Sequence, residues 1–167
     1  MATLEVLTLP DPRLKLVSTP ITDITAEIDR FVQDFTETMQ SFRGCVGLAA
    51  PQVDFPFRIV AVDVSVGRKP HPNHGLMVML NPVVTACEGS ESMREGCLSV
   101  PDFTGNVRRP TNISLTYLDP TGKECHLDTE GFEARAILHE IDHLDGLLFL
   151  DRVSSLKDDV FRRKNYL

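Results

Sequence analysis

The stretch His139-Glu140-Ile141-Asp142-His143, near the C-terminal end of the chain, decides how the rest of the sequence is interpreted. Two histidines four positions apart lie one turn above the other on one face of an α-helix, so both imidazoles can reach one metal ion. Glu140 then points to the side where a metal-bound water would lie. This H-E-x-x-H pattern is typical of a catalytic metal site. The alternative is a core helix whose two polar residues merely share a face.

The residues around this motif favour a helix. Phe132 to Leu144 contains neither proline nor glycine, and Gly146 follows where a helix commonly ends. The segment is apolar on most of its circumference, so we expect it to be buried among strands.

A catalytic site of this kind needs a third protein ligand and an open position. Metalloprotease motifs place that ligand downstream, but no glutamate follows Glu140 and no histidine follows His143. Phe149 stands where the longer metalloprotease motif has its last histidine. The third ligand is therefore expected upstream, where Cys97, next to a glycine, stands out. Other upstream histidines, cysteines and carboxylates stay open as candidates, and a free cysteine is often a small buried apolar residue.

Three segments together resemble the peptide deformylase family. They are GLAAPQ at 47–52, EGCLS at 95–99 and HEIDH at 139–143, and their order and spacing match that family. The segments that begin at Asp11 and at Val107 look similar too, so the resemblance covers essentially the whole chain. It is more specific than the H-E-x-x-H motif alone.

The resemblance implies a cofactor and a reaction. It implies that Cys97, His139 and His143 bind one divalent metal ion, with water in the fourth position. Fe(II) is the implied physiological ion, and Zn, Ni or Co are able to occupy the site, since thiolate and imidazole suit several metals. The implied reaction is hydrolysis of the N-formyl group from the N-terminal formyl-methionine of newly made polypeptides, with release of formate.

The resemblance also implies roles for three further groups. A metal ion lowers the pKa of its water towards neutrality, and Glu140 would take the proton and deliver it to the leaving amine. The family assigns stabilisation of the negative charge on the formyl oxygen to the Gln52 side-chain amide and the Leu98 backbone N–H. A surface glutamine after a proline turn is the alternative for Gln52.

The substrate is expected to lie extended and to pair with the protein backbone. Its partners would be backbone groups near Gly47 and from Met93 to Glu95, in the manner of an added β-strand. Glycine at position 47 would allow the peptide to approach closely. Backbone pairing would let one enzyme accept many sequences after the methionine.

The methionine side chain requires an apolar pocket. Phe132 and Ala136 lie on the same helix face as His139, with Val46 as the expected opposite wall; both helix residues also fit an ordinary core. Family matching adds Arg135 at the pocket rim. It also places Arg109 nearby, although a solvated surface arginine would explain that position equally well.

Two residues depart from the family pattern. Cys45 stands where the family usually has a glycine, and Leu138 stands where it commonly has a glutamine. Cys45 would put a thiol near the rim of the site, either oxidation-sensitive or simply packed. Neither change touches an expected ligand, so an active enzyme is expected.

Composition sets the class of protein. At 167 residues with 42% hydrophobic content, the chain is expected to form one domain over 1–167. A net charge of −7 disfavours DNA or other nucleic acid as the main ligand. We expect no membrane span, no signal peptide and reduced cysteines, which together indicate a cytoplasmic protein of bacterial type. An organelle is not excluded.

The predicted fold class is α+β, with mixed and mainly antiparallel strands packed around the central buried helix that carries H-E-x-x-H. An amphipathic helix is predicted over 25–42, with Thr25 as its N-cap. Strands are predicted at 58–64, 77–84, 113–118 and 124–128, with a hairpin turn at 119–122. A short C-terminal helix is predicted within 154–167. Its basic end, Arg162 to Lys164, would either touch ribosomal RNA, where the nascent substrate emerges, or be solvated.

Three functions from different classes follow from these patterns. A metal-dependent deformylase should release formate from formyl-methionyl peptides. A zincin-like endopeptidase should cleave internal peptide bonds, but it needs a downstream ligand that the chain lacks. A non-catalytic relative should bind metal and formyl-peptide without turnover, and the presence of Glu140 and Gln52 counts against it.

Overall fold

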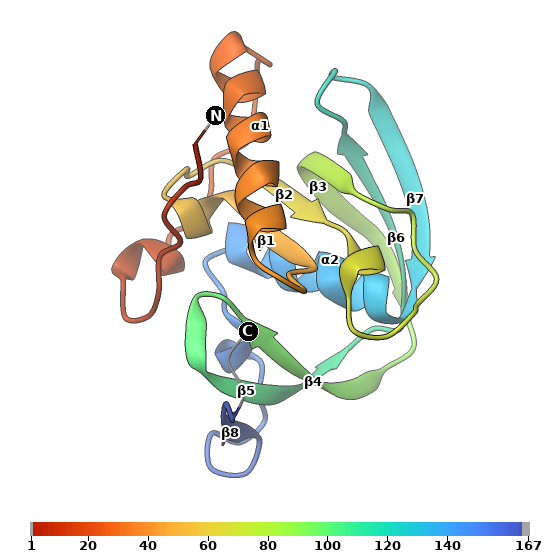
Figure 1. Ribbon diagram of the computed structural model, residues 1–167. Helices are drawn as coiled ribbons and strands as arrows, with labels where there is room; N and C mark the ends of the chain where they lie inside the picture. The colour runs from red at the N-terminus through yellow and green to blue at the C-terminus, as the bar shows by residue number, and fades with distance from the viewer. Residues whose placement is uncertain (1, 165–167) are drawn as a thin grey trace.

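Helix α2 (Gly131–Leu144) lies at the centre of the molecule, between a large sheet and a smaller one (Figure 1). The computed structural model describes residues 2–164. In these residues the large sheet has five strands in the order β1-β2-β3-β6-β7, and the small one has three in the order β4-β5-β8. All paired neighbours run antiparallel. The α+β prediction is confirmed.

The strands and helices have the following bounds. The large sheet consists of β1 (Gly47–Ala49), β2 (Ile59–Val62), β3 (Met77–Glu88), β6 (Asn112–Leu118) and β7 (Glu124–Glu130). The small sheet consists of β4 (Glu91–Cys97), β5 (Val100–Arg109) and β8 (Val160–Arg162). Besides α1 (Ala26–Ser41) and α2, the described part of the chain contains four short 3₁₀ helices, η1 (Pro12–Lys15), η2 (Ala50–Val53), η3 (Val64–Val66) and η4 (Phe149–Asp151).

The large sheet is covered by a helix on each face, and strand β2 shows why. All four residues of β2 are buried, and their side chains alternate between the two faces. Ile59 and Ala61 belong to a core cluster shared with α1, whereas Val60 and Val62 belong to a cluster shared with α2. A strand buried on both sides reads as a continuous apolar run rather than an alternating one.

Helix α1 forms as its sequence predicts. The Thr25 hydroxyl accepts a hydrogen bond from the Ile28 N–H at 3.4 Å, which caps the first turn. Its apolar stripe packs on the large sheet through Ile28, Phe31, Phe35 and Met39, all of which are buried. The helix thereby fixes the sheet face that faces away from α2.

The predicted C-terminal helix is wrong for the residues that the structure describes. Residues 154–159 form turns, and Val160–Arg162 form strand β8, which pairs with Phe103 to Gly105 of β5. Positions 165–167 of that prediction lie outside the described residues. The physical reason is the free edge of β5, whose backbone groups gain partners from an added strand but none from a helix.

Strands β4 and β5 were not among the predicted strands. They form a hairpin closed by a tight turn at residues 98 and 99, and most of β4 is exposed. Pro101 lies at the second position of β5, where a missing N–H is tolerated. No helix in the described part of the chain is long and apolar enough to cross a membrane.

Candidate active site

Three potential metal ligands come together between the small sheet and α2. Their ligand atoms, the Cys97 sulfur and one ring nitrogen each from His139 and His143, lie within 4.8 Å of one another. Cys97 Sγ is 3.3 Å from His143 Nε2. All three residues are buried. Cys97 is the last residue of β4, so the hairpin turn that follows delivers the thiol to the helix.

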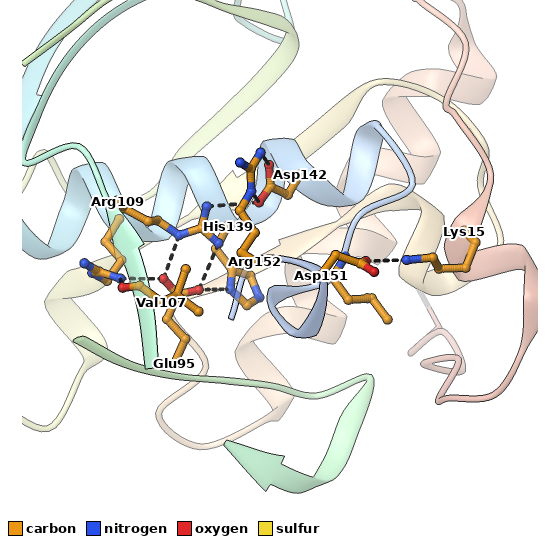
Figure 2. Close-up of polar contacts among 10 residues, drawn as sticks. Lys15, Glu95, Val107, Arg109, His139, Asp142, Asp151 and Arg152 are labelled. Carbon is orange, nitrogen blue, oxygen red and sulfur yellow. Dashed lines mark hydrogen bonds and ion pairs between the residues drawn. The ribbon is translucent and has the colours of Figure 1, made fainter. Parts of the chain in front are cut away.

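Glu95 holds one of the two imidazoles from behind. His139 Nδ1 donates a hydrogen bond to Glu95 Oε1 at 2.8 Å, which leaves Nε2 as the nitrogen able to bind a metal (Figure 2). Arg109 contacts both oxygens of the same carboxylate, Nε to Oε2 at 2.6 Å and Nη2 to Oε1 at 2.9 Å. Burial alone would raise the pKa of Glu95, but the hydrogen bonds from His139 and Arg109 lower it to about 2.

The ion-pair network continues along α2. Arg109 Nη1 donates to Asp142 Oδ2 at 2.9 Å, and Arg152 makes a two-pronged contact with Asp142, with both distances at 2.8 Å. Figure 2 shows these side chains in sequence from Glu95 to Arg152. Arg109 is only 4% exposed. The structure therefore places Arg109 not at the surface but in a buried network that joins β4, β5 and α2.

Arg135 is bound to the same carboxylate. Its Nη1 donates to Glu95 Oε2 at 2.7 Å and to the Val107 carbonyl at 2.8 Å, while Nη2 donates to the Glu91 carbonyl at 2.7 Å. It lines the cavity described below. With its donors occupied in this way, Arg135 supports the wall of the cavity more than it offers a free charge.

Glu140 is a buried carboxylate with an open oxygen. Its Oε1 has no hydrogen-bond partner among the described residues. Burial raises the pKa of Glu140 to about 7. A carboxyl with a pKa near neutrality can both accept and release a proton under ordinary conditions. The unpartnered oxygen marks a place where a water or a substrate proton would be bound.

Gln52 presents its amide N–H groups to the ligand cluster. Its Oε1 accepts a hydrogen bond from the Ala49 N–H at 2.9 Å, and its Nε2 donates to Ser99 Oγ at 3.0 Å and to Cys97 Sγ at 3.4 Å. The residue is 1% exposed. Its setting is therefore buried and fixed, unlike that of a surface glutamine.

A cavity of about 330 Å³ opens onto this cluster. Of the residues singled out from the sequence it is lined by Cys45, Val46, Gly47, Gln52, Glu95, Cys97, Leu98, Phe132, Arg135, Ala136, His139 and Glu140. His143, Met93 and Arg109 do not line it. Strand β1 forms one wall and strand β4 the other, and each is the end strand of its sheet within the described residues.

Sequence reasoning missed two features of this cavity. Glu95 was expected only as a backbone partner of the substrate, yet its side chain binds His139. The one available signal was its position two residues before Cys97 in an extended segment, which puts residues on the same side of a strand. Arg163 also lines the cavity. The sequence around it gave no indication of this position, because only the pairing of β8 with β5 brings Arg163 to the cavity.

The donor set fits a divalent cation. One thiolate and two imidazoles suit a borderline metal ion and leave a coordination position open. Burial lowers the pKa of His143, which keeps that ring neutral, as a ligand must be. Burial also opposes a charge on His139, but the negative charge of Glu140 raises its pKa.

The fold and the site together define a metal-dependent hydrolase. The chain belongs to the polypeptide deformylase family, whose model matches residues 3–159. It is 41% identical to a peptide deformylase of Thermodesulfovibrio yellowstonii, over 98% of this chain and 97% of that protein. It is 43% identical to peptide deformylase 1 of Vibrio vulnificus, over 98% and 94%.

Solved structures agree with the sequence relatives. A peptide deformylase from Ehrlichia chaffeensis in complex with actinonin superposes with a TM-score of 0.86 at 36% identity, covering 94% of this chain and 92% of that one. A peptide deformylase from Legionella pneumophila gives 0.84 at 35% identity, covering 93% and 88%. The protein is therefore a peptide deformylase, a metalloenzyme that removes the N-formyl group from new polypeptides, and this prediction is confirmed.

Proposed function

We propose that Cys97, His139 and His143 hold the metal ion of this deformylase, and that the ion is Fe(II) in the cell. The observation that carries the proposal is the convergence of these three buried ligand atoms within 4.8 Å. When bound there, a divalent cation supplies a Lewis acid that polarises the formyl carbonyl and acidifies water. Glu95 keeps the ring of His139 in the ligating orientation through its 2.8 Å hydrogen bond.

Glu140 is the proposed general base and acid. Its unpartnered Oε1 accepts a proton from the attacking water, and the same carboxyl then donates a proton to the amine nitrogen as the C–N bond breaks. A pKa of about 7 suits both transfers, because neither direction is strongly uphill near neutral pH. The products are formate and a polypeptide with a free N-terminal amine.

Gln52 and Leu98 are proposed to stabilise the developing oxyanion. The Gln52 Nε2 group is already oriented towards the ligand cluster by the Ala49 N–H and Ser99 Oγ. An amide fixed in this way loses little entropy when negative charge forms on the formyl oxygen. The Leu98 backbone N–H would supply a second donor from the turn that follows Cys97.

The substrate is proposed to lie between the end strands β1 and β4. Gly47 and Glu95 would offer backbone groups to an extended peptide, since neither strand has a neighbour on its outer side among residues 2–164. The methionine side chain would be held by Val46, Phe132 and Ala136, which line the apolar part of the cavity. Met93 stays a proposed backbone partner of the peptide, whereas Arg109, which does not line the cavity, would act on the site only through Glu95.

Two further proposals concern the setting of the enzyme. The four cysteines are free, and Cys97 must be a thiolate to bind metal, which fits a reducing compartment such as the cytoplasm. The ribosome is the proposed partner from which substrate emerges. Arg162 and Lys164 are exposed and would contact ribosomal RNA. Replacing both with glutamine should then weaken co-sedimentation with ribosomes; unchanged co-sedimentation contradicts this partner.

The central test is formate release from formyl-Met-Ala-Ser by protein loaded anaerobically with Fe(II) or Ni(II). The Glu140→Ala variant should lose about 10²–10⁴-fold in turnover while it binds one metal ion per chain like the parent. Metal content and peptide affinity are measured on both proteins. A parent that carries metal and binds the peptide but releases no formate would contradict the proposed catalytic roles.

A further inference from the structure

Two nitrogen atoms of the Arg163 guanidinium group have no hydrogen-bond partner in the described part of the chain. Its Nε and Nη2 atoms are buried, and neither has a hydrogen-bond partner among residues 2–164. An arginine side chain is always charged and presents N–H donors in a planar fork. A buried donor without a partner is costly. A bound ligand with a hydrogen-bond acceptor would therefore supply the partner that these two donors lack.

The backbone of β8 determines where this group lies. Strand β8 pairs with β5 from Phe103 to Gly105, and the Arg163 N–H then donates to the Asp102 carbonyl at 2.8 Å. The side chain extends from there across the backbone of Gly96 in β4. A Cβ added at Gly96 would lie 2.6 Å from Arg163 Nη2, so a larger residue there would displace the guanidinium from this position.

Gly96 directly precedes Cys97, the proposed metal ligand. Arg163 thus reaches the cavity beside the ligand cluster, and it lines the cavity together with Arg94 and Arg43. Adjacent residues of an extended chain are about 3.3 Å apart. A peptide whose formyl group lies at Cys97 and which runs along β4 would bring its methionine past Gly96. The next two residues follow at about 3.3 Å each, so their side chains or chain end come within reach of the Arg163 guanidinium.

Among the described residues that line the cavity, no carboxylate pairs with Arg163. Arg94 stacks over the ring of Phe161 at 3.7 Å and donates to Asn106, so it adds positive charge without neutralising any. Of the carboxylates that line the cavity, Glu95 is already paired with two arginines and a histidine, and Glu140 lies at the ligand cluster. The mouth of the cavity is therefore positive, although the chain carries a net charge of −7.

We propose that Arg163 is a specificity residue that binds a carboxylate of the substrate, carried by the second or third residue of the formyl-methionyl peptide. The inference rests on the proposed course of the peptide along β4. The carboxylate is either an aspartate or glutamate side chain or the free C-terminus of a short peptide. A fork of two N–H groups matches the two oxygens of either one.

The test compares amidated peptides that differ by one charge. Formyl-Met-Asp-Ser-amide is compared with formyl-Met-Asn-Ser-amide, and formyl-Met-Ser-Asp-amide with formyl-Met-Ser-Asn-amide. We expect kcat/KM to favour one acidic peptide by about tenfold, mainly through KM, as a charge-assisted hydrogen bond provides. High salt should reduce this preference. Comparing formyl-Met-Ala-Ser with its C-terminal amide tests whether the free C-terminus supplies the carboxylate that Arg163 binds.

Three variants locate the preference. Arg163→Gln should abolish it while leaving turnover of the neutral peptides and the melting temperature nearly unchanged. Arg163→Lys should keep part of it, because the charge remains but the fork is lost. Arg162→Gln is the matched control, since Arg162 is the exposed neighbour in β8 and does not line the cavity.

The outcomes separate this inference from the proposed function. A parent enzyme that deformylates the neutral peptides but shows no preference for a carboxylate overturns the inference and leaves the function intact. A preference that survives in Arg163→Gln overturns it as well. A preference for the free C-terminus alone supports the carboxylate site and assigns it to the chain end. A parent that deformylates none of the peptides contradicts the function itself.

Discussion

The backbone of Gly47 lies directly against the carboxylate of Glu140. A Cβ atom added at Gly47 would be 2.5 Å from Glu140 Oε2 and 3.0 Å from Cδ, closer than non-bonded atoms approach. Strand β1 therefore sets the position of the proposed general base, and the absence of a side chain at residue 47 is a requirement of the site. The glycine has this role in addition to any contact with a peptide.

The Gly47→Ala variant should lose about 10²-fold in kcat, because the new methyl group pushes the Glu140 carboxylate from its place. Metal content should stay at one ion per chain, since no ligand moves. Steady-state formate release gives the rate. Gly75→Ala is the control: its added methyl group meets no atom within 4 Å, although the positive φ of 70° costs stability. Equal activity of parent and Gly47→Ala would disprove the steric argument.

Replacing Gln52 with glutamate should lower kcat by about 10²–10³-fold, the usual effect of losing one oxyanion donor. The glutamate can still accept from the Ala49 N–H but presents an oxygen where Nε2 donates. Ser99→Ala is the matched control, because it removes only the hydroxyl group that accepts a hydrogen bond from Gln52 Nε2. It should cost much less. If the two variants were equally impaired, orientation rather than donation would be the function of Gln52.

Arg109→Gln should lower the free energy of unfolding by about 3–5 kcal/mol, because Glu95 and Asp142 lose a buried partner. Metal affinity should fall by about 10–100-fold, since Glu95 positions His139. Denaturant unfolding and metal titration measure the two effects. Arg108→Gln is the control, as the neighbouring Arg108 is exposed and its side chain donates a hydrogen bond to Ser90 Oγ rather than to a buried carboxylate. Similar losses in both variants would argue against the network.

Cys45 should react with iodoacetamide at pH 8 at least tenfold more slowly than Cys87. Burial raises the pKa of the Cys45 thiol to about 12, so almost no thiolate is present at that pH. Cys87 is exposed. Peptide mapping after timed labelling gives both rates. Rapid labelling of Cys45 in the folded protein would instead support the oxidation-sensitive role.

The elements that could be predicted from the sequence are those whose signals are local. Helix α1 has a capping threonine and a helical repeat of apolar residues. Strand β2 is an apolar run, and β7 alternates between more buried and exposed residues, whereas the three-residue strand β1 was not predicted. Strand β4 is mostly exposed and carries charged residues, so it shows no such pattern. Strand β8 is a strand only because β5 offers it a free edge, which a reading of residues 154–167 alone cannot reveal.

The site shows the same division. The positions of Cys97, His139, Glu140 and Gln52 followed from motifs that resemble a family, and the structure brings these residues together. The location of Arg109 did not follow, because its partners Glu95 and Asp142 lie in segments far from it in the sequence. Ion pairs between distant segments have no local signature, and a buried arginine is indistinguishable from a solvated one until its partners are placed.

The carboxylate of Glu95 joins the small sheet to α2, and this has a mechanical consequence. Through Arg109, Arg135 and His139 it connects β4 to β5 and to the helix that lies on the large sheet. Separating the two sheets would leave the buried carboxylate of Glu95 without its partners. Hinge motion between the sheets is therefore energetically unfavourable. We therefore expect the two walls of the cleft to keep their separation when a peptide binds, so that a nascent chain enters a groove that is already formed.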